Sequence, residues 1–335
     1  MSKSPYILAI DQGTSSTRAA LIDKKGIIID QESIEFKQIY PLSGWVEHDP
    51  LEILQTVKST ISIIFERNHI IENDIVSCGI TNQRETIVAW DKVTGKPSYN
   101  AIVWQDRRTN EICKNLVNKN YTNLIQEKTG LIIDPYFSAS KIQWLLENIK
   151  DQQNLIVGTI DTWIIWNLTN KVKHVTDITN ASRTMLYNIK DEIWDHELLD
   201  LFNIRKSILP TVLSNKDEYG RIHTEHFGIE IPIGGVVGDQ QSASLGQLCL
   251  KKGMIKATYG TGCFVLINTD KNKITSKNKL LTTIASKIDE KKQYAVEGSI
   301  FNAGTVIQWL RDEMKLFNHV NEIEEIIQDS KNDVT

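Results

Sequence analysis

Cysteine is scarce in this chain, which has only four cysteines among its 335 residues. They lie far apart and form no Cys-x-x-Cys pair, at Cys78, Cys113, Cys249 and Cys263. Closely paired cysteines are typical of zinc sites, and dense, regularly spaced cysteines are typical of disulfide-rich secreted domains. The sequence therefore predicts neither kind of framework and favours a reducing compartment, the cytoplasm by default.

The chain also lacks long apolar runs and a large excess of positive or negative charge. The most apolar run, residues 155–168, is too short to span a bilayer and contains Asp161. Residues 1–10 lack the apolar segment and cleavage site of a signal peptide. The net charge is -4 and the lysines and arginines form no stripe, so we expect no nucleic-acid partner and no membrane span. A small molecule is the expected partner.

The composition is that of a soluble globular protein, with 41% hydrophobic and 24% charged residues. A chain of 335 residues exceeds what one hydrophobic core usually supports, so two domains are expected. The sequence does not fix an oligomeric state, and a homo-oligomer stays open.

The segment YILAIDQGTSSTRAALID at residues 6–23 has a pattern that can bind phosphate. It predicts an apolar strand, a tight turn over residues 11–16 and a second strand. Gly13 lets the backbone approach a ligand closely, and successive backbone N–H groups in such a turn form an anion-binding concavity. Hydroxyl donors follow at Thr14, Ser15, Ser16 and Thr17. Asp11 is placed to hold Mg²⁺.

The same residue types also form ordinary polar hairpin turns, so this segment alone leaves both interpretations open. It is not a Walker A loop, because no Gly-Lys-Ser/Thr follows.

Strands alternate with helices along the rest of the chain, which predicts an α/β protein with ligands at strand ends. Asp49 and Pro50 predict the start of a helix that runs to about residue 68. A buried strand over residues 75–81 leads directly into Arg84 and Glu85. Arg84 and Glu85 alone would more often be a surface ion pair.

Later segments extend this pattern. A strand over residues 232–238 delivers Asp239 just past its end, where an aspartate can also serve as a helix cap. Residues 174–187 are expected to be a polar loop. Trp163 and Trp166 are expected to lie in the core rather than at a ligand.

The opening pattern returns at residues 253–268, with strand, Gly260-Thr261-Gly262 turn and strand. Two such hairpins favour a nucleotide site between duplicated domains that face one another across a cleft.

Several motifs in order resemble those of the glycerol kinases. They are DQGT (11–14), GWVEHDP (44–50), GITNQRET (79–86), NAIVWQDRRT (100–109), GLIIDPYFS (130–138), VTDITNASRTML (175–186), GDQQSASLGQLC (238–249) and TYGTGCF (258–264). The resemblance extends from residue 6 to about residue 317. It implies an α/β fold of two ribonuclease-H-like (actin-type ATPase) domains, and it implies ATP-dependent phosphorylation of glycerol to sn-glycerol 3-phosphate with Mg²⁺.

The resemblance also implies the roles of individual residues. The glycerol hydroxyls would bind to Arg84, Glu85, Tyr136, Asp239 and Gln240, and the carbon skeleton would pack against Trp104 and Phe264. The nucleotide would meet Thr14, Ser15, Ser16, Arg18, Thr261, Gly304 and Gln308. Asp11 would serve the magnesium, and Asp239 would be the general base.

The chain departs from the family in one respect, because it ends at Thr335 whereas the family continues through the rest of the second domain. We expect residues 1–250 to form the N-terminal kinase domain, with the glycerol site and the first phosphate hairpin. Residues 251–335 would begin a truncated C-terminal nucleotide-binding domain, without the glycine-rich segment for adenosine.

Three interpretations stay open. The chain could be a glycerol kinase, in whole or as the larger part of one. It could be a related pentose or other sugar kinase, against which the NQRE and DPYF stretches argue. It could be a catalytically inactive, truncated remnant.

Overall fold

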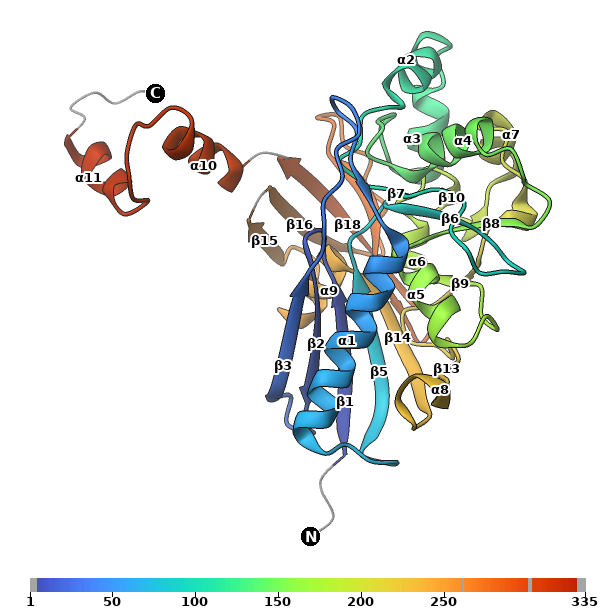
Figure 1. Ribbon diagram of the computed structural model, residues 1–335. Helices are drawn as coiled ribbons and strands as arrows, with labels where there is room; N and C mark the ends of the chain where they lie inside the picture. Colours follow the sequence, from blue (N-terminus) through green and yellow to red (C-terminus); the bar gives the residue numbers. More distant parts are fainter. Residues whose placement is uncertain (1–4, 261, 301–302, 330–335) are drawn as a thin grey trace.

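The computed structural model of the protein describes residues 5–260, 262–300 and 303–329 (Figure 1). The strands are β1 (Tyr6–Gln12), β2 (Ser16–Ile22), β3 (Ile28–Glu35), β4 (Glu47–His48), β5 (Ile75–Asn82), β6 (Ile87–Asp91), β7 (Ala101–Ile102), β8 (Leu155–Thr159), β9 (Val175–Asp177), β10 (Tyr187–Asn188), β11 (Ile193–Trp194), β12 (Thr211–Leu213), β13 (Arg221–Ile222), β14 (Ile231–Gly238), β15 (Ile255–Tyr259), β16 (Cys263–Asp270), β17 (Leu281–Ile288) and β18 (Lys291–Ile300).

The helices are α1 (Pro50–Asn68), α2 (Asn110–Asn118), α3 (Thr122–Thr129), α4 (Ser138–Asn148), α5 (Ile160–Leu168), α6 (Ile178–Ala181), α7 (His196–Leu201), α8 (Thr224–Phe227), α9 (Asp239–Gly246), α10 (Gly304–Asp312) and α11 (Glu322–Asp329), with a 3₁₀ turn at Lys206–Ile208. None of the described helices has the length and apolar character needed to traverse a bilayer.

A six-stranded sheet with the order β13-β14-β5-β1-β2-β3 forms the centre of the first half of the chain. β1, β2 and β3 are consecutive antiparallel strands, whereas β5 and β14 run parallel to β1. One face of the parallel strands is buried and apolar, with Leu8, Ile10 and Val236 almost fully inaccessible, whereas Val76 on the other face is 50% exposed. Because β1, β5 and β14 point the same way, the loops after all three strands meet at one edge of the sheet.

Helix α1 covers β2 and β3 on one face of this sheet. Asp49 is its N-cap and accepts a hydrogen bond from Leu51 N at 2.8 Å, with Pro50 at the first helical position. His69 ends the helix in the left-handed conformation with φ of 51°. The helix predicted from Asp49 and Pro50 to about residue 68 is therefore confirmed.

A second layer is built around the four-stranded sheet β4-β7-β6-β8. Trp163 on α5 is fully buried, and its ring lies edge-on to Trp90 with centroids 5.2 Å apart. Trp166 is 8% exposed. The prediction that Trp163 and Trp166 lie in the core is confirmed.

The expectation of a polar loop over residues 174–187 is right only in part. Residues 182–186 form turns, but residues 175–181 form β9 and α6 instead, and residues 175–187 are all buried. Polar groups tolerate burial when they are hydrogen-bonded, and Asp177 accepts hydrogen bonds from Thr179 N at 2.6 Å and Asn180 N at 3.0 Å. Asn180 in turn exchanges two amide hydrogen bonds with Asn82, at the end of β5.

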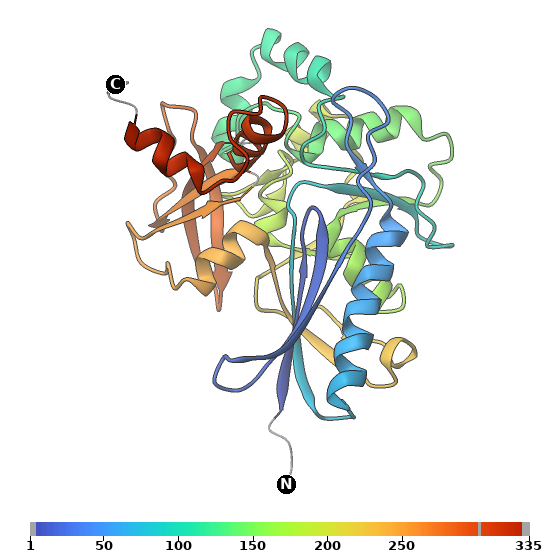
Figure 2. The same ribbon diagram turned by 60° about the vertical axis from the view of Figure 1, so that its left-hand side comes forward.

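The antiparallel sheet β15-β16-β18-β17 follows α9, and Figure 2 shows it in orange to one side of the blue strands β1–β3. Strand β17 is its docking edge, because Leu281 and Ile284 share one apolar cluster with Phe137 of the first half. Thr282 N donates to Gly130 O at 2.8 Å. Helices α10 and α11 lie beyond the end of β18, away from the six-stranded sheet (Figure 1).

Candidate active site

A cavity of about 310 Å³ opens where the strand ends of the first half meet the sheet β15–β18. Two hairpins with the strand-turn-strand pattern described above, here called the phosphate-type hairpins, line this cavity. The first, β1–β2, contributes Thr14 and Ser15, and the second, β15–β16, contributes Thr258, Gly260 and Gly262. The remaining lining residues include Arg84, Glu85, Trp104, Tyr136, Asp239, Gln240 and Phe264. These seven are the side chains that the resemblance to the glycerol kinases implies for glycerol, and the structure brings all of them to one cavity.

Arg84 and Glu85 lie just after β5, following Gln83, and are buried, with exposures of 2% and 1%. They are therefore not a surface ion pair. Glu85 has φ of 61°, a left-handed conformation that is costly for a residue with a side chain. The tight turn at Glu85 aims both side chains into the cavity instead of continuing the strand.

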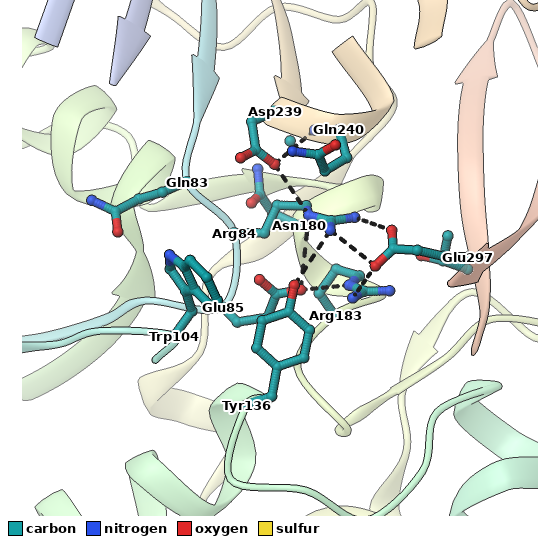
Figure 3. Close-up of polar contacts among 12 residues, drawn as sticks. Gln83, Arg84, Glu85, Trp104, Tyr136, Asn180, Arg183, Asp239, Gln240 and Glu297 are labelled. Atoms are coloured by element: carbon teal, nitrogen blue, oxygen red, sulfur yellow. Dashed lines mark hydrogen bonds and ion pairs between the residues drawn. The ribbon is translucent and has the colours of Figure 1, made fainter. Parts of the chain in front are cut away.

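Two residues that the sequence analysis did not assign complete the charge network around Arg84 (Figure 3). Glu297 of β18 accepts Arg84 Nη1 at 2.7 Å and Arg84 Nη2 at 3.1 Å. Arg183, just after α6, donates through Nη2 to Glu297 Oε1 at 2.8 Å and through Nε to Glu85 Oε1 at 2.5 Å. Arg84 Nε lies 3.8 Å from Glu85 Oε1 and closes a ring of two arginines and two glutamates.

The ring changes how its carboxylates titrate. Burial alone would raise the pKa of Glu297, but Arg183 and Arg84 outweigh burial and lower its pKa to about 2. Burial raises the pKa of Glu85, although Arg183 and Arg84 oppose this shift. Glu297 is therefore the firmly ionised partner of both arginines.

Arg183 and Glu297 each had a weak sequence signal. Arg183 lies in the quoted segment VTDITNASRTML, and Glu297 is a charge in the otherwise uncharged strand segment YAVEGS. A charged residue inside a buried strand requires a partner, but nothing local in the sequence identifies it.

Asp239 is the first residue of α9, directly after β14. Its side chain is 35% exposed, and Oδ1 lies 3.2 Å from Arg84 Nε. Oδ1 also accepts Gln240 N at 2.6 Å. Burial raises the pKa of Asp239 and Arg84 opposes the shift, which suits a carboxylate that accepts a proton in the cavity.

Three aromatic rings form an apolar wall beside these charges. Trp104 lies edge-on to Tyr136 with centroids 5.7 Å apart and to Phe264 with centroids 6.1 Å apart. Trp104 Nε1 donates to Thr14 Oγ1 at 2.9 Å, so the wall is tied to the first hairpin. The hydroxyl of Tyr136 lies 3.4 Å from Arg84 Nη2.

Backbone and side-chain hydrogen bonds fix the turn of the first hairpin. Gly13 N donates to Ser16 O at 2.9 Å, and Gln38 Nε2 donates to Thr14 O at 3.0 Å. His48 Nε2 lies 2.7 Å from Gln38 Oε1 and fixes its orientation. Burial lowers the pKa of His48 to about 4, so the ring is neutral at neutral pH.

Asp11 lies opposite Arg18 in the β1–β2 register, and neither lines the cavity; Ser16 is also outside its lining. Burial raises the pKa of Asp11, while the charge of Arg18 opposes the shift. No group of three or more His, Cys, Asp or Glu suited to a metal occurs among the residues that the structure describes. Asp11 is thus a single carboxylate beside the first hairpin turn; Mg²⁺ sites in proteins often have only one or two carboxylates, with waters and substrate phosphates as the other ligands.

Of the three residues expected to line the nucleotide cleft from the second half of the chain, the structure places one beside the second hairpin and one away from the cavity. Gly260 N donates to Gly262 O at 2.9 Å, and Gly304 N donates to Gly260 O at 2.9 Å, so Gly304 lies next to the turn. Gln308 is exposed on α10 and does not line the cavity. Thr261 lies outside the described residues.

Known proteins resemble this chain over nearly its whole length. A "Glycerol kinase" of Chromobacterium violaceum is 51% identical over 333 residues, which are 98% of this chain and 67% of that protein. A "Glycerol kinase" of Rhizobium meliloti is 54% identical over 317 residues, 93% of this chain and 64% of that protein. The chain therefore spans about two thirds of the length of these curated relatives.

Solved structures give the same result. The structure of Plasmodium falciparum glycerol kinase with ADP matches with a TM-score of 0.92 and 40% identity, over 98% of this chain and 67% of that chain. The ligand-bound xylulose kinase of Lactobacillus acidophilus matches with a TM-score of 0.86 and 26% identity, over 97% of this chain and 66% of that chain. The expected α/β fold of the actin-like, ribonuclease-H-like kinases is confirmed.

Residues 6–246 match the N-terminal domain of the FGGY family of carbohydrate kinases, and residues 255–333 match its C-terminal domain. Together with relatives more than 50% identical, these matches confirm the resemblance to the glycerol kinases. The chain belongs to the FGGY family of carbohydrate kinases.

Proposed function

We propose that this chain transfers the γ-phosphoryl group of ATP to glycerol and forms sn-glycerol 3-phosphate. One observation carries the proposal: hydrogen-bonding side chains and an aromatic wall converge in a single cavity that both phosphate-type hairpins also reach. The names of the relatives, glycerol kinases more than 50% identical, support glycerol as the acceptor. Free, buried cysteines are consistent with a cytoplasmic location.

The cavity offers what a small polyol requires. Arg84 would donate from Nε and Nη2, the side of its guanidinium that faces Asp239 and the hydroxyl of Tyr136. Glu85 would accept hydrogen bonds, and Tyr136 can do either. Asp239 and Gln240 add an acceptor and an amide on the side of α9. Trp104 and Phe264 would cover the carbon skeleton. Sites that pair buried polar groups with hydroxyls reject deoxy analogues by about 10⁴-fold or more.

Asp239 is proposed as the general base. As the glycerol oxygen attacks the γ-phosphorus, its proton passes to Asp239, and the bond from the γ-phosphorus to the bridging oxygen breaks to release ADP. The pKa of Asp239, raised by burial, brings this carboxylate closer to the proton affinity that such a step requires. Arg84, at 3.2 Å, keeps the carboxylate oriented.

The phosphates would meet the two hairpins. Thr14, Ser15, Ser16 and Arg18 would contact them from the first hairpin, and Thr261, Gly304 and Gln308 would contribute from the second domain. Asp11 would hold Mg²⁺, which when bound neutralises phosphate charge. Phosphoryl transfer asks a protein mainly for positioning and charge neutralisation, which the fixed turns at Gly13 and Gly260 are suited to provide.

Glycerol-dependent ADP formation by the purified chain tests the proposal, with Asp239→Asn as the matched blank. We expect the wild-type chain to form ADP with glycerol and Mg-ATP, and Asp239→Asn to lose at least ~10²-fold in turnover while it still binds glycerol. A folded chain without glycerol-dependent ADP formation would contradict the proposal. Activity that survives in Asp239→Asn would refute the role of Asp239 as base.

A panel of acceptors separates glycerol from larger sugars. We expect glycerol to be preferred over xylulose and other pentoses, because the seven assigned side chains match the glycerol kinase motifs. A preference for a pentose would assign the chain to a different substrate class of the same family.

A further inference from the structure

We propose that Arg183 and Glu297 are positioning residues of the acceptor site, which hold Arg84 and Glu85 in the geometry that binds glycerol. The inference rests on the proposed function, because it assigns Arg84 and Glu85 to the glycerol hydroxyls. Neither Arg183 nor Glu297 lines the cavity, so both would act through the residues that do.

Glu297 determines where the guanidinium of Arg84 lies. Its two oxygens accept Arg84 Nη1 at 2.7 Å and Nη2 at 3.1 Å, a bidentate pair that fixes both the position and the plane of the guanidinium. Gln241 Oε1 accepts Nη1 at 3.0 Å as well. With these nitrogens fixed, Arg84 presents Nε toward Asp239 and Nη2 toward the hydroxyl of Tyr136.

Arg183 performs the matching task for Glu85. Its Nε donates to Glu85 Oε1 at 2.5 Å while its Nη2 donates to Glu297 Oε1 at 2.8 Å. Arg183 therefore links the acceptor carboxylate to the carboxylate that holds Arg84. Its guanidinium carbon also lies 5.5 Å from the ring centroid of Tyr136, and so it supports a third residue of the site.

Charge balance explains why the ring needs all four members. All four side chains are at most 2% exposed, and two positive charges offset two negative charges. Loss of Glu297 would leave the two neighbouring guanidinium groups with Glu85 as their one fully buried carboxylate partner, because Asp239 beside Arg84 is 35% exposed. Removal of one partner from a buried charge pair is costly because the other is left uncompensated, so the remaining side chains would rearrange.

The ring also spans the two family domains. Arg84, Glu85 and Arg183 lie in the segment that matches the N-terminal domain, whereas Glu297 lies in the segment that matches the C-terminal domain. The acceptor site in the first domain is thus completed by a carboxylate from the second. When β18 packs against the first domain, Glu297 reaches Arg84, so the packing of this strand and the placement of the Arg84 guanidinium depend on one another.

Glu297→Gln in the full chain tests the inference. We expect the KM and the calorimetric Kd for glycerol to rise by about 100-fold, since small misplacements of a positioned group cost that much, while the KM for ATP changes by less than about threefold. Glu290→Gln is the matched control. It removes a glutamate from the turn between β17 and β18. The side chain of Glu290 is 87% exposed and lies 3.3 Å from Lys287 Nζ, so the constants of this variant should stay at wild-type values.

Arg183→Lys provides the second variant, because it keeps the charge but loses the fork. We expect a rise in glycerol KM of about tenfold or more with little change for ATP. A purely structural role would lower the melting temperature of Glu297→Gln and Arg183→Lys and leave glycerol binding by the folded protein unchanged, and that result would overturn the inference.

The same titrations separate the two proposals. If the wild-type chain binds glycerol and Glu297→Gln binds it equally well, the inference is wrong and the proposed function stands. If the wild-type chain does not bind glycerol at all, both are wrong.

Discussion

At the scale of single residues, the site is determined by where buried charges find partners. Glu85 lies in the left-handed region with φ of 61°, and this strained conformation persists because Arg183 and Arg84 hold its carboxylate. The local sequence identified Arg84, Glu85 and Asp239 as strand-end side chains. It could not show that Arg183 pairs with Glu297, because these two partners are 114 positions apart in the chain.

The first residue-scale prediction concerns Arg84. We expect Arg84→Ala to weaken glycerol binding by ~10²-fold or more, because the guanidinium that donates to hydroxyls is lost. It should also lower the free energy of unfolding by about 3–5 kcal/mol, since Glu297 is left with one buried partner. Calorimetry on the folded variant, with denaturant unfolding in parallel, checks both. Unchanged glycerol affinity would refute the placement of Arg84.

The second residue-scale prediction concerns acid. The pKa of Glu297 is about 2 in the folded chain and near 4.3 in an unfolded one, so its stabilisation is fully present above pH ~4.3 and is lost as the pH falls toward ~2. Below pH ~4.3 the wild-type chain should therefore lose stability more steeply than Glu297→Gln. Urea unfolding of both proteins at several pH values measures the difference. Parallel curves would show that Glu297 does not carry the effect.

At the scale of elements, local sequence patterns predicted the helices and strands whose ends depend on neighbouring residues in the chain. The cap at Asp49 and Pro50 determines the start of α1, and the apolar run before Arg84 forms β5. Residues 175–181 of the polar segment were wrongly predicted to be loop, because their burial depends on Asp177 and on Asn180 paired with distant Asn82. Side-chain pairs that cross the fold have no local sequence pattern.

The element-scale prediction concerns Gly130, which ends α3 with φ of 75°. A Cβ at this position would lie 2.3 Å from Thr282 O of β17. We expect Gly130→Ala to lower the free energy of unfolding by about 2 kcal/mol or more, from backbone strain and the clash with the docking edge. Thermal and urea unfolding measure it.

Gly228→Ala is the control for this prediction. Gly228 ends α8 with the same φ of 75°, but nothing lies within 4 Å of a Cβ there. We expect Gly228→Ala to lower the free energy of unfolding by only about 1 kcal/mol, because backbone strain is the one penalty at this position. Equal losses in the two variants would mean that the contact with β17 contributes nothing.

At the scale of the whole molecule, two domains share both a core and a site. Leu281, Ile284 and Tyr294 of the second domain lie in the same apolar cluster as Tyr136, which lines the cavity. The meeting of the two hairpins at one cavity was predictable from the repeated strand-turn-strand pattern. The boundary near residue 250 and the roles of the site residues stay predictions.

The whole-molecule prediction concerns ligand-linked stability. If glycerol binds only the folded chain, glycerol at 100 times its Kd should stabilise the chain by about 2.7 kcal/mol. We expect this gain for the wild type and its near absence in Arg84→Ala at the same glycerol concentration. Differential scanning calorimetry over a glycerol series measures both. A gain that persists in Arg84→Ala would point to a binding site elsewhere.

The ring of Arg84, Glu85, Arg183 and Glu297 also has a consequence during protein synthesis. Three of its four members have left the ribosome long before residue 297 is made. Until then the two arginines have Glu85 as their one fully buried carboxylate partner, with the partly exposed Asp239 beside Arg84. An uncompensated buried charge is strongly unfavourable, so the nascent first domain cannot close this region by itself. Its last folding step waits for β18, and a protease that probes nascent chains should find the turn around Glu85 open until that strand emerges.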